Sequence, residues 1–133
     1  MGQYIEQFEE LAKDLKAISP VLVADAYFSK FEYTHSVVSQ GMEFISRLRV
    51  DANLRYLYNG SQKSGRGRKK KFAGKVNTKK IDKRRVKQMY EDEEIRVYSL
   101  IVNSVNLKRN ILLVCVEYLN SLGNVTNMSM YFS

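Results

Sequence analysis

The sequence has little of several residues that usually mark a specialised class of protein. It contains one cysteine, Cys115, one histidine, His35, one proline, Pro20, and no tryptophan among its 133 residues. A single cysteine excludes a disulfide within the chain and fits a reducing compartment, so we expect a cytoplasmic location. A lone histidine without partners at ligand spacing argues against a zinc site. Cys115 lies among Val and Leu, which indicates a buried small side chain rather than a nucleophile.

Long apolar runs and nucleotide-binding motifs are also absent. No apolar run approaches the roughly 20 residues that a membrane helix needs, and the N-terminus has no signal-peptide pattern, so we expect no membrane partner. Neither GxxxxGK[ST] nor GxGxxG after a strand occurs. The composition, 44% hydrophobic and 27% charged, is that of an ordinary globular chain of one domain or a domain with an appendage.

The positive charge is concentrated in one segment. The formal net charge is +8, and residues 63–87 hold thirteen Lys and Arg against one acid, Asp82. The remainder holds nine basic and thirteen acidic residues, so a mildly acidic body carries a strongly basic segment. This asymmetry indicates a polyanionic partner, most often nucleic acid. The alternative is a solvated loop that only aids solubility.

The first fifty residues alternate between helical and strand patterns. Apolar residues recur every three or four positions over residues 3–17, which predicts an amphipathic helix. Residues 21–24 predict a strand buried on both faces. Ser29 with Glu32 has the pattern of a capping box for a helix that ends near Gln40, and residues 43–49 predict the next strand. We therefore expect a leading helix and a parallel βαβ unit with a right-handed crossover.

Asp25 is the candidate functional residue of this unit, because it follows the first strand directly. Ligands of open α/β sheets bind at the carboxyl ends of strands, so Asp25 is a candidate metal ligand or acid/base group. The alternative is an aspartate that caps a turn. Glu43 and Asp51 bracket the second strand, but the sequence places neither of them beside Asp25.

The rest of the chain differs in kind. Residues 51–58 fit either a helical turn or an edge strand, residues 64–74 predict a mobile loop, and residues 77–89 fit a short amphipathic helix or extended chain. Tyr56 and Tyr58 could stack on bases or be half-buried packing residues. Strand patterns at residues 95–102, 111–118 and 127–133 predict an antiparallel meander. Because the last pattern reaches Ser133, we expect a piece of a longer protein.

These segments together resemble one family. Residues 23–28, Val-Ala-Asp-Ala-Tyr-Phe, resemble the segment around the second catalytic aspartate of DDE-class insertion-sequence transposases. Residues 41–49 and 51–54 are similar to the helix end, strand and turn that follow in that family. Residues 65–74 resemble its basic "GRGRP+KYG" loop, with Lys69 at the usual proline position. Residues 129–133 are similar to the strand that precedes the segment leading to its catalytic glutamate.

The resemblance implies an α/β (α+β) fold: a partial ribonuclease-H-like core over residues 1–50 and a basic loop with a β-rich insertion over residues 51–133. It implies metal-dependent cleavage and strand transfer of DNA, with Asp25 as one catalytic ligand of a two-Mg²⁺ site. The other aspartate and the glutamate would lie outside this chain, so the fragment alone should be inactive. Transposon ends and target DNA would be the partners, and a homodimer of the full-length protein is one assembly that this interpretation allows.

The basic segment would then contact DNA phosphates. The residues assigned to this contact are Arg66, Arg68, Lys69, Lys70, Lys71, Lys75, Lys79, Lys80, Lys83, Arg84 and Arg85. Two alternatives stay open: a non-catalytic nucleic-acid-binding module, which needs only this segment and the tyrosines, and an interaction domain in which the charge is incidental.

Overall fold

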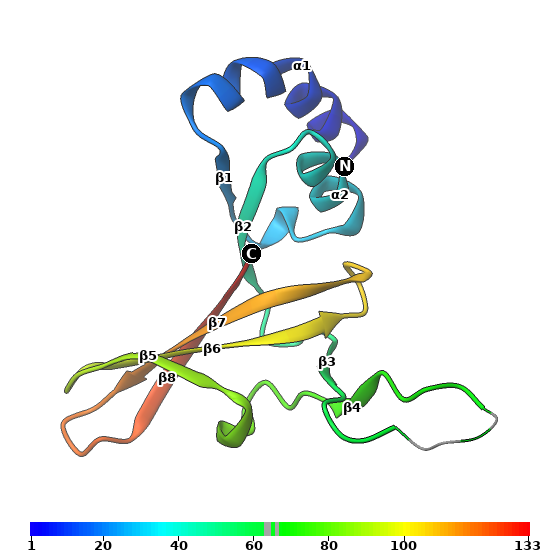
Figure 1. Cartoon of the computed structure of the whole chain (residues 1–133). Coiled ribbons are helices and arrows are strands. Elements are labelled where there is room, and N and C mark those ends of the chain that lie inside the picture. The colour runs from blue at the N-terminus through cyan, green and yellow to red at the C-terminus, as the bar shows by residue number, and fades with distance from the viewer. Residues whose placement is uncertain (63–64, 66) are drawn as a thin grey trace.

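The structure is a computed structural model that describes residues 1–62, 65 and 67–133. The chain begins with helix α1, strand β1, a 3₁₀ turn (η1), helix α2 and strand β2 (Figure 1). This order confirms the two helices and two strands expected in the first fifty residues. Their bounds are α1 Gly2–Ile18, β1 Val21–Ala24, η1 Ala26–Phe28, α2 Phe31–Ser39 and β2 Glu43–Leu48.

Strands β1 and β2 pair in parallel, as expected for a βαβ unit. Val21 lies opposite Glu43, and Ala24 lies opposite Ser46. Helix α2 connects them and is followed by Gly41 at φ +79°, a left-handed conformation that glycine adopts without strain. The chain can therefore reverse into β2 within a few residues.

Two local expectations for this unit are wrong. Strand β1 is the edge of the sheet rather than a strand buried on both faces, and Val23 is 71% exposed. The apolar residues 21–24 therefore belong to an edge strand that packs on one face only. The α2 cap also differs: Lys30 occupies the N-cap position, and its ammonium group cannot accept a cap bond. The Ser29 hydroxyl bonds across to β2.

The remaining described residues form six strands and a second 3₁₀ turn (η2). The meander expected from the last three strand patterns is confirmed by the antiparallel pairs β6·β7 and β7·β8. The ambiguous segments resolve into extended chain, with β3 before the basic loop and η2 and β5 after it. The bounds are β3 Leu54–Leu57, β4 Phe72–Lys75, η2 Lys83–Arg85, β5 Lys87–Glu91, β6 Ile95–Ser104, β7 Arg109–Leu119 and β8 Val125–Phe132.

All eight strands belong to one mixed sheet, so the described residues form an α+β fold. The strand order is β1-β2-β8-β7-β6-β3-β4, and β5 pairs with the other half of the β6 edge. The joint between the two halves of the chain is the pairing of β2 with β8, where Leu48 lies opposite Met130 and Ser46 opposite Phe132. Figure 1 shows this joint in the middle of the molecule, between the helices and the meander.

The buried core is continuous across that joint. Phe8 of α1 and Tyr33 of α2 pack over Phe44, whose ring meets Phe132 of β8 at 5.7 Å between centroids. Leu11, one of the apolar residues that recur along α1, is 52% exposed. None of the helices in the described part of the chain is long and apolar enough to cross a membrane.

Candidate nucleic-acid interface and the Asp25 turn

Asp25 lies in an exposed turn directly after β1. Its Oδ1 accepts a hydrogen bond from the Tyr27 backbone N–H at 2.9 Å and so caps the 3₁₀ turn η1. This is the capping role that the sequence offered as the alternative to metal binding. The two roles are compatible, because a carboxylate has a second oxygen and Oδ2 forms no hydrogen bond with the described residues.

Two serine hydroxyls hold the backbone of this turn against β2. Ser46 is 1% exposed, and its Oγ donates to the Asp25 carbonyl oxygen at 2.8 Å. Ser29 Oγ lies 2.9 Å from Ser46 Oγ and donates to the Arg47 carbonyl oxygen at 2.8 Å. The turn that carries Asp25 is thus tied to the neighbouring parallel strand through hydrogen bonds around the buried Ser46, which fixes its path.

A polar pocket of about 220 Å³ adjoins this turn. Ala26 and Ser29 line one side, and residues that follow β2, with the β6–β7 turn, line the other. Asp51 is one of the lining residues, and Arg49 Nε lies 3.4 Å from its carboxylate. The pocket therefore has an acid of its own, but that acid already has a cationic partner.

The residues present do not form a magnesium site. Mg²⁺ takes oxygen ligands in near-octahedral geometry, usually from more than one carboxylate. The described residues include no group of three His, Cys, Asp or Glu side chains that could hold a metal ion. Asp25 is one exposed carboxylate with one oxygen already bonded, so a Mg²⁺ ion would need ligands from outside these residues.

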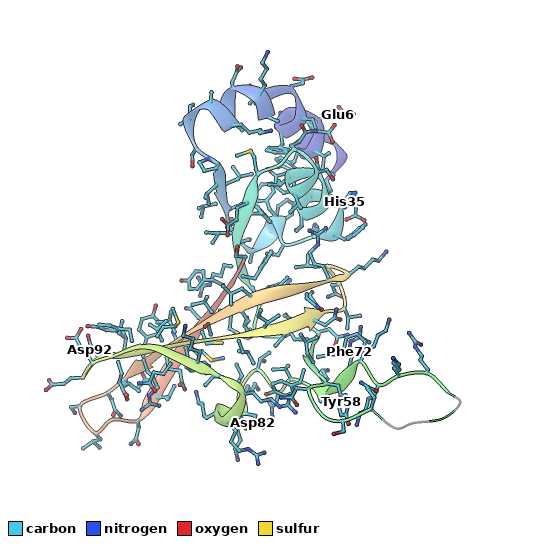
Figure 2. The ribbon with its side chains drawn as sticks, viewed as in Figure 1. Glu6, His35, Tyr58, Phe72, Asp82 and Asp92 are labelled. Atoms are coloured by element: carbon cyan, nitrogen blue, oxygen red, sulfur yellow. The ribbon has the colours of Figure 1, made fainter. Side chains whose placement is uncertain are left out.

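The basic segment lies on the other side of the molecule from the helices. Figure 1 shows β4, the turn η2 and β5 along the side of the sheet opposite α1 and α2. Asp82, labelled in Figure 2, marks the turn. Tyr58, which directly follows β3, and Phe72, which begins β4, lie at the neighbouring β3–β4 pair. No hydrogen bond or ion pair in the described part of the chain connects these basic residues with Asp25.

Two of the predicted DNA-binding cations have internal partners. Lys83 Nζ lies 2.5 Å from Glu117 Oε1 and 3.5 Å from the centroid of the Tyr98 ring. Arg85 donates from Nη1 to the Leu57 carbonyl oxygen at 3.2 Å, and its guanidinium lies 4.9 Å from the Tyr56 ring. Both side chains hold the segment on the sheet, so their charge is partly used within the protein.

Arg84 is intermediate between these anchors and the free cations. Its Nε lies 3.1 Å from Asp82 Oδ1, yet its side chain is 90% exposed. Hydrogen bonds from the Arg84 side chain and backbone lower the pKa of Asp82. An exposed pair of this kind is weak and exchanges readily with water or a phosphate.

The other predicted cations point outward. They are exposed, and none of them forms an ion pair with the described residues. Lys70 differs slightly, because its Nζ lies 4.9 Å from the Tyr58 ring centroid. Arg66 lies outside the described residues. The outward set is Arg68, Lys69, Lys70, Lys71, Lys75, Lys79 and Lys80, and Lys87 of β5 is also exposed.

The tyrosines beside the basic segment have packing roles. The Tyr56 hydroxyl accepts a hydrogen bond from the Asp82 backbone N–H at 2.9 Å, and its ring faces Arg85. The Tyr58 hydroxyl donates to the Ser61 carbonyl oxygen at 2.6 Å. Both are half-buried, which agrees with the packing alternative rather than with open platforms for bases.

The single histidine and cysteine fall where the sequence indicated. His35 is exposed on α2 and stacks on Phe31 at 5.4 Å between ring centroids. Cys115 is buried in β7, and this burial raises the pKa of its thiol to about 11. A thiol with that pKa is almost fully protonated near neutral pH, so it is a poor nucleophile.

Sequence reasoning missed Glu117 and Ser46. Glu117 occupies an inward position of β7, in the same alternation as Ile111, Leu113 and Cys115. Ser46 occupies an inward position of β2, between Phe44 and Leu48. A polar residue at an inward position of an otherwise apolar strand was the signal that could have found them, because burial requires it to have a partner.

Comparison of the chain with protein-family models, curated proteins and solved structures found no match. The assignment of a function therefore depends on the geometry of the Asp25 turn and the basic segment, and on the residues that resemble a family in the sequence.

Proposed function

We propose that this chain is part of a DDE-class DNA transposase, in which Asp25 is one carboxylate of the catalytic site and the basic segment contacts DNA phosphates. The observation that carries the proposal is the position of Asp25. It is an exposed carboxylate at the carboxyl end of β1, in a parallel pair with β2. Carboxyl ends of parallel strands are where α/β sheets place functional groups.

The arrangement around Asp25 supports a partial ribonuclease-H-like core as the proposed fold family. A helix leads into β1, α2 connects β1 to β2, and a β-rich segment follows β2. That segment returns through β8 to pair with β2. The proposed reaction is metal-dependent cleavage and strand transfer of DNA. The described residues supply one of the carboxylates it needs and no complete metal site.

The outward cations support the DNA contact. Lys75 ends β4, and Lys79 and Lys80 lie between β4 and η2. None of the three has an acidic partner among the described residues. Exposed lysines of this kind bind phosphates as point charges and release counterions when they do so. The proposed partners are duplex transposon ends and target DNA.

A salt titration tests the DNA contact. We expect the 133-residue chain to bind a fluorescein-labelled DNA duplex at low salt. Its affinity should fall steeply between roughly 50 and 200 mM salt, because phosphate contacts displace counterions. Binding that is absent at low salt, or that does not change over this range, would contradict the contact.

The catalytic part needs a separate test in the full-length parent protein. Asp25→Asn keeps the size of the side chain and removes its charge. Loss of strand cleavage with unchanged duplex affinity is the expected result, and Asp14→Asn, on the exposed face of α1, is the matched control. Unchanged cleavage by Asp25→Asn would refute a catalytic role.

A non-catalytic nucleic-acid-binding module is the second candidate. It is favoured by the hydrogen bond from the Tyr27 backbone N–H to Asp25 Oδ1, which gives this carboxylate a capping role that needs no metal. This candidate predicts the same salt-dependent binding and no effect of Asp25→Asn on any DNA reaction.

A further inference from the structure

The turn η2, which carries part of the basic segment, is held on the sheet by a buried carboxylate. Glu117 lies on the inward face of β7, and its side chain is 9% exposed. Lys83, the first residue of η2, reaches it with an Nζ–Oε1 distance of 2.5 Å. Arg96 of β6 lies on the same oxygen at 3.7 Å. One buried acid therefore holds two cations from different elements.

The ammonium group of Lys83 is fixed from a second direction. It lies 3.5 Å from the centroid of the Tyr98 ring, and Tyr98 is 2% exposed. Cation–π and charge-assisted contacts to the same group add to its restraint. The Lys83 side chain is still 48% exposed, so its charge is only partly neutralised within the protein, and its contacts with Glu117 and Tyr98 also fix the position of η2.

Residues on either side of Lys83 fix η2 to β3. Arg85 donates to the Leu57 carbonyl oxygen, and the backbone N–H of Asp82 donates to the Tyr56 hydroxyl at 2.9 Å. The turn is thus held between β7 on one side and β3 on the other. Lys79 and Lys80, whose side chains are exposed, precede η2 by a few residues, and the exposed Arg84 lies within it.

We propose that Glu117 is a positioning residue for nucleic-acid binding, which fixes η2 so that the neighbouring exposed cations are arranged before DNA arrives. This inference rests on the proposed DNA contact and adds the residue that controls it. The Glu117 carboxylate is buried whereas the Lys83 side chain is 48% exposed, so the pair restrains the geometry of η2 more than it adds to net stability. Ordering long side chains on binding reduces affinity. Without the Glu117–Lys83 contact, η2 would have to be ordered when DNA binds, and the entropy cost of that ordering would reduce affinity.

The inference predicts that Glu117→Gln changes duplex affinity in the opposite direction to the change expected from net charge alone. Glu117→Gln removes a negative charge and should tighten binding to a polyanion if charge alone mattered. If the carboxylate positions η2, we expect Glu117→Gln to weaken duplex binding about five- to tenfold. The salt dependence should also become shallower, by about 0.9 in slope for each phosphate that the variant no longer neutralises.

The matched control is Glu93→Gln. Glu93 is exposed in the turn between β5 and β6 and forms no ion pair with the described residues, so its substitution changes the net charge by the same amount. Affinity equal to or tighter than that of the unaltered chain is expected for this control. Equal affinity and equal salt slope for Glu117→Gln and Glu93→Gln would overturn the inference.

A second pair of variants keeps the test valid if Glu117→Gln does not fold. Lys83→Met removes the same tether from the other side and leaves Glu117 with Arg96. Its control, Lys80→Met, removes an exposed cation. Both variants remove one positive charge, so the anchor is supported if Lys83→Met weakens duplex binding more than Lys80→Met does. Binding by Lys83→Met that is equal to or tighter than binding by Lys80→Met refutes it. Failure of the unaltered chain to bind duplex at low salt would instead refute the proposed DNA contact.

Discussion

Replacement of Phe132 by alanine should destabilise both halves of the molecule together. Phe132 is 2% exposed in β8, where it lies opposite Leu113 of β7 and Ser46 of β2, and its ring packs edge-on against Phe44 at 5.7 Å between centroids. Phe132→Ala therefore removes a buried ring from the joint between the helical part and the meander.

The expected loss is about 4 kcal/mol in the free energy of unfolding, within the range for buried Phe→Ala changes. At roughly 4 °C per kcal/mol for a chain of this length, the melting temperature should fall by roughly 15 °C. Val125→Ala, at a 47% exposed position of the same strand, is the control and should cost less than about 0.5 kcal/mol.

Urea unfolding followed by far-ultraviolet circular dichroism, which reports the helices, and by tyrosine fluorescence, which reports the whole chain, measures this loss. We expect a single shared transition whose midpoint falls for both signals. A loss below about 1 kcal/mol, or a meander that unfolds while the helices stay folded, would refute the reasoning that the core is continuous through Phe132.

Three further outcomes follow from the described geometry. The double variant Lys79→Ala with Lys80→Ala should lower the salt slope of duplex binding by about 1.8 if both contact phosphates, and an unchanged slope would exclude them from the interface. Cys115 should resist a thiol reagent at pH 8, because burial raises the pKa of its thiol to about 11, and its reaction rate should rise only as the pH approaches that value or the chain unfolds. Gly41→Ala should cost about 1 kcal/mol in a thermal melt, because φ is +79° there; no loss would show that the turn can rearrange.

The local elements of this chain follow closely from its sequence. Periodic apolar residues marked α1, and the alternation between helical and strand patterns predicted the parallel pair β1·β2 and the terminal meander. Each of these features depends on residues that are near one another in the chain. Gly41 ended α2 as its position indicated, because few residues accept a left-handed conformation.

The features that were missed depend on interactions between distant segments. Ser29 has the sequence pattern of a helix cap, yet its hydroxyl bonds to Ser46 and to the Arg47 carbonyl oxygen on another strand. Nothing local distinguishes those two uses of a serine. Likewise, the thirteen cations of the basic segment look alike in the sequence, and the distant Glu117 distinguishes Lys83 from Lys79 and Lys80, which form no ion pair with the described residues.

The sequence predicted that Asp25 lies at the end of a strand, but it did not predict the surroundings of that strand. Asp25 ends β1 as expected, but the edge position of that strand could not be derived from an apolar run, since a doubly covered strand has the same composition. The polar pocket beside it is built from η1 and the β6–β7 turn, which lie far apart in the chain.

The pairing of β2 with β8 also has a consequence for folding during synthesis. Leu48 of β2 can pair with Met130 of β8 only after the whole intervening sequence has been synthesised. Until β8 is available, β2 can pair with β1 alone, and the backbone N–H and C=O groups on its other edge stay unpaired. Closing so long a segment is slow compared with forming a hairpin, so folding should be limited by the arrival of β8. An N-terminal piece that lacks β8 should therefore be prone to aggregation through β2.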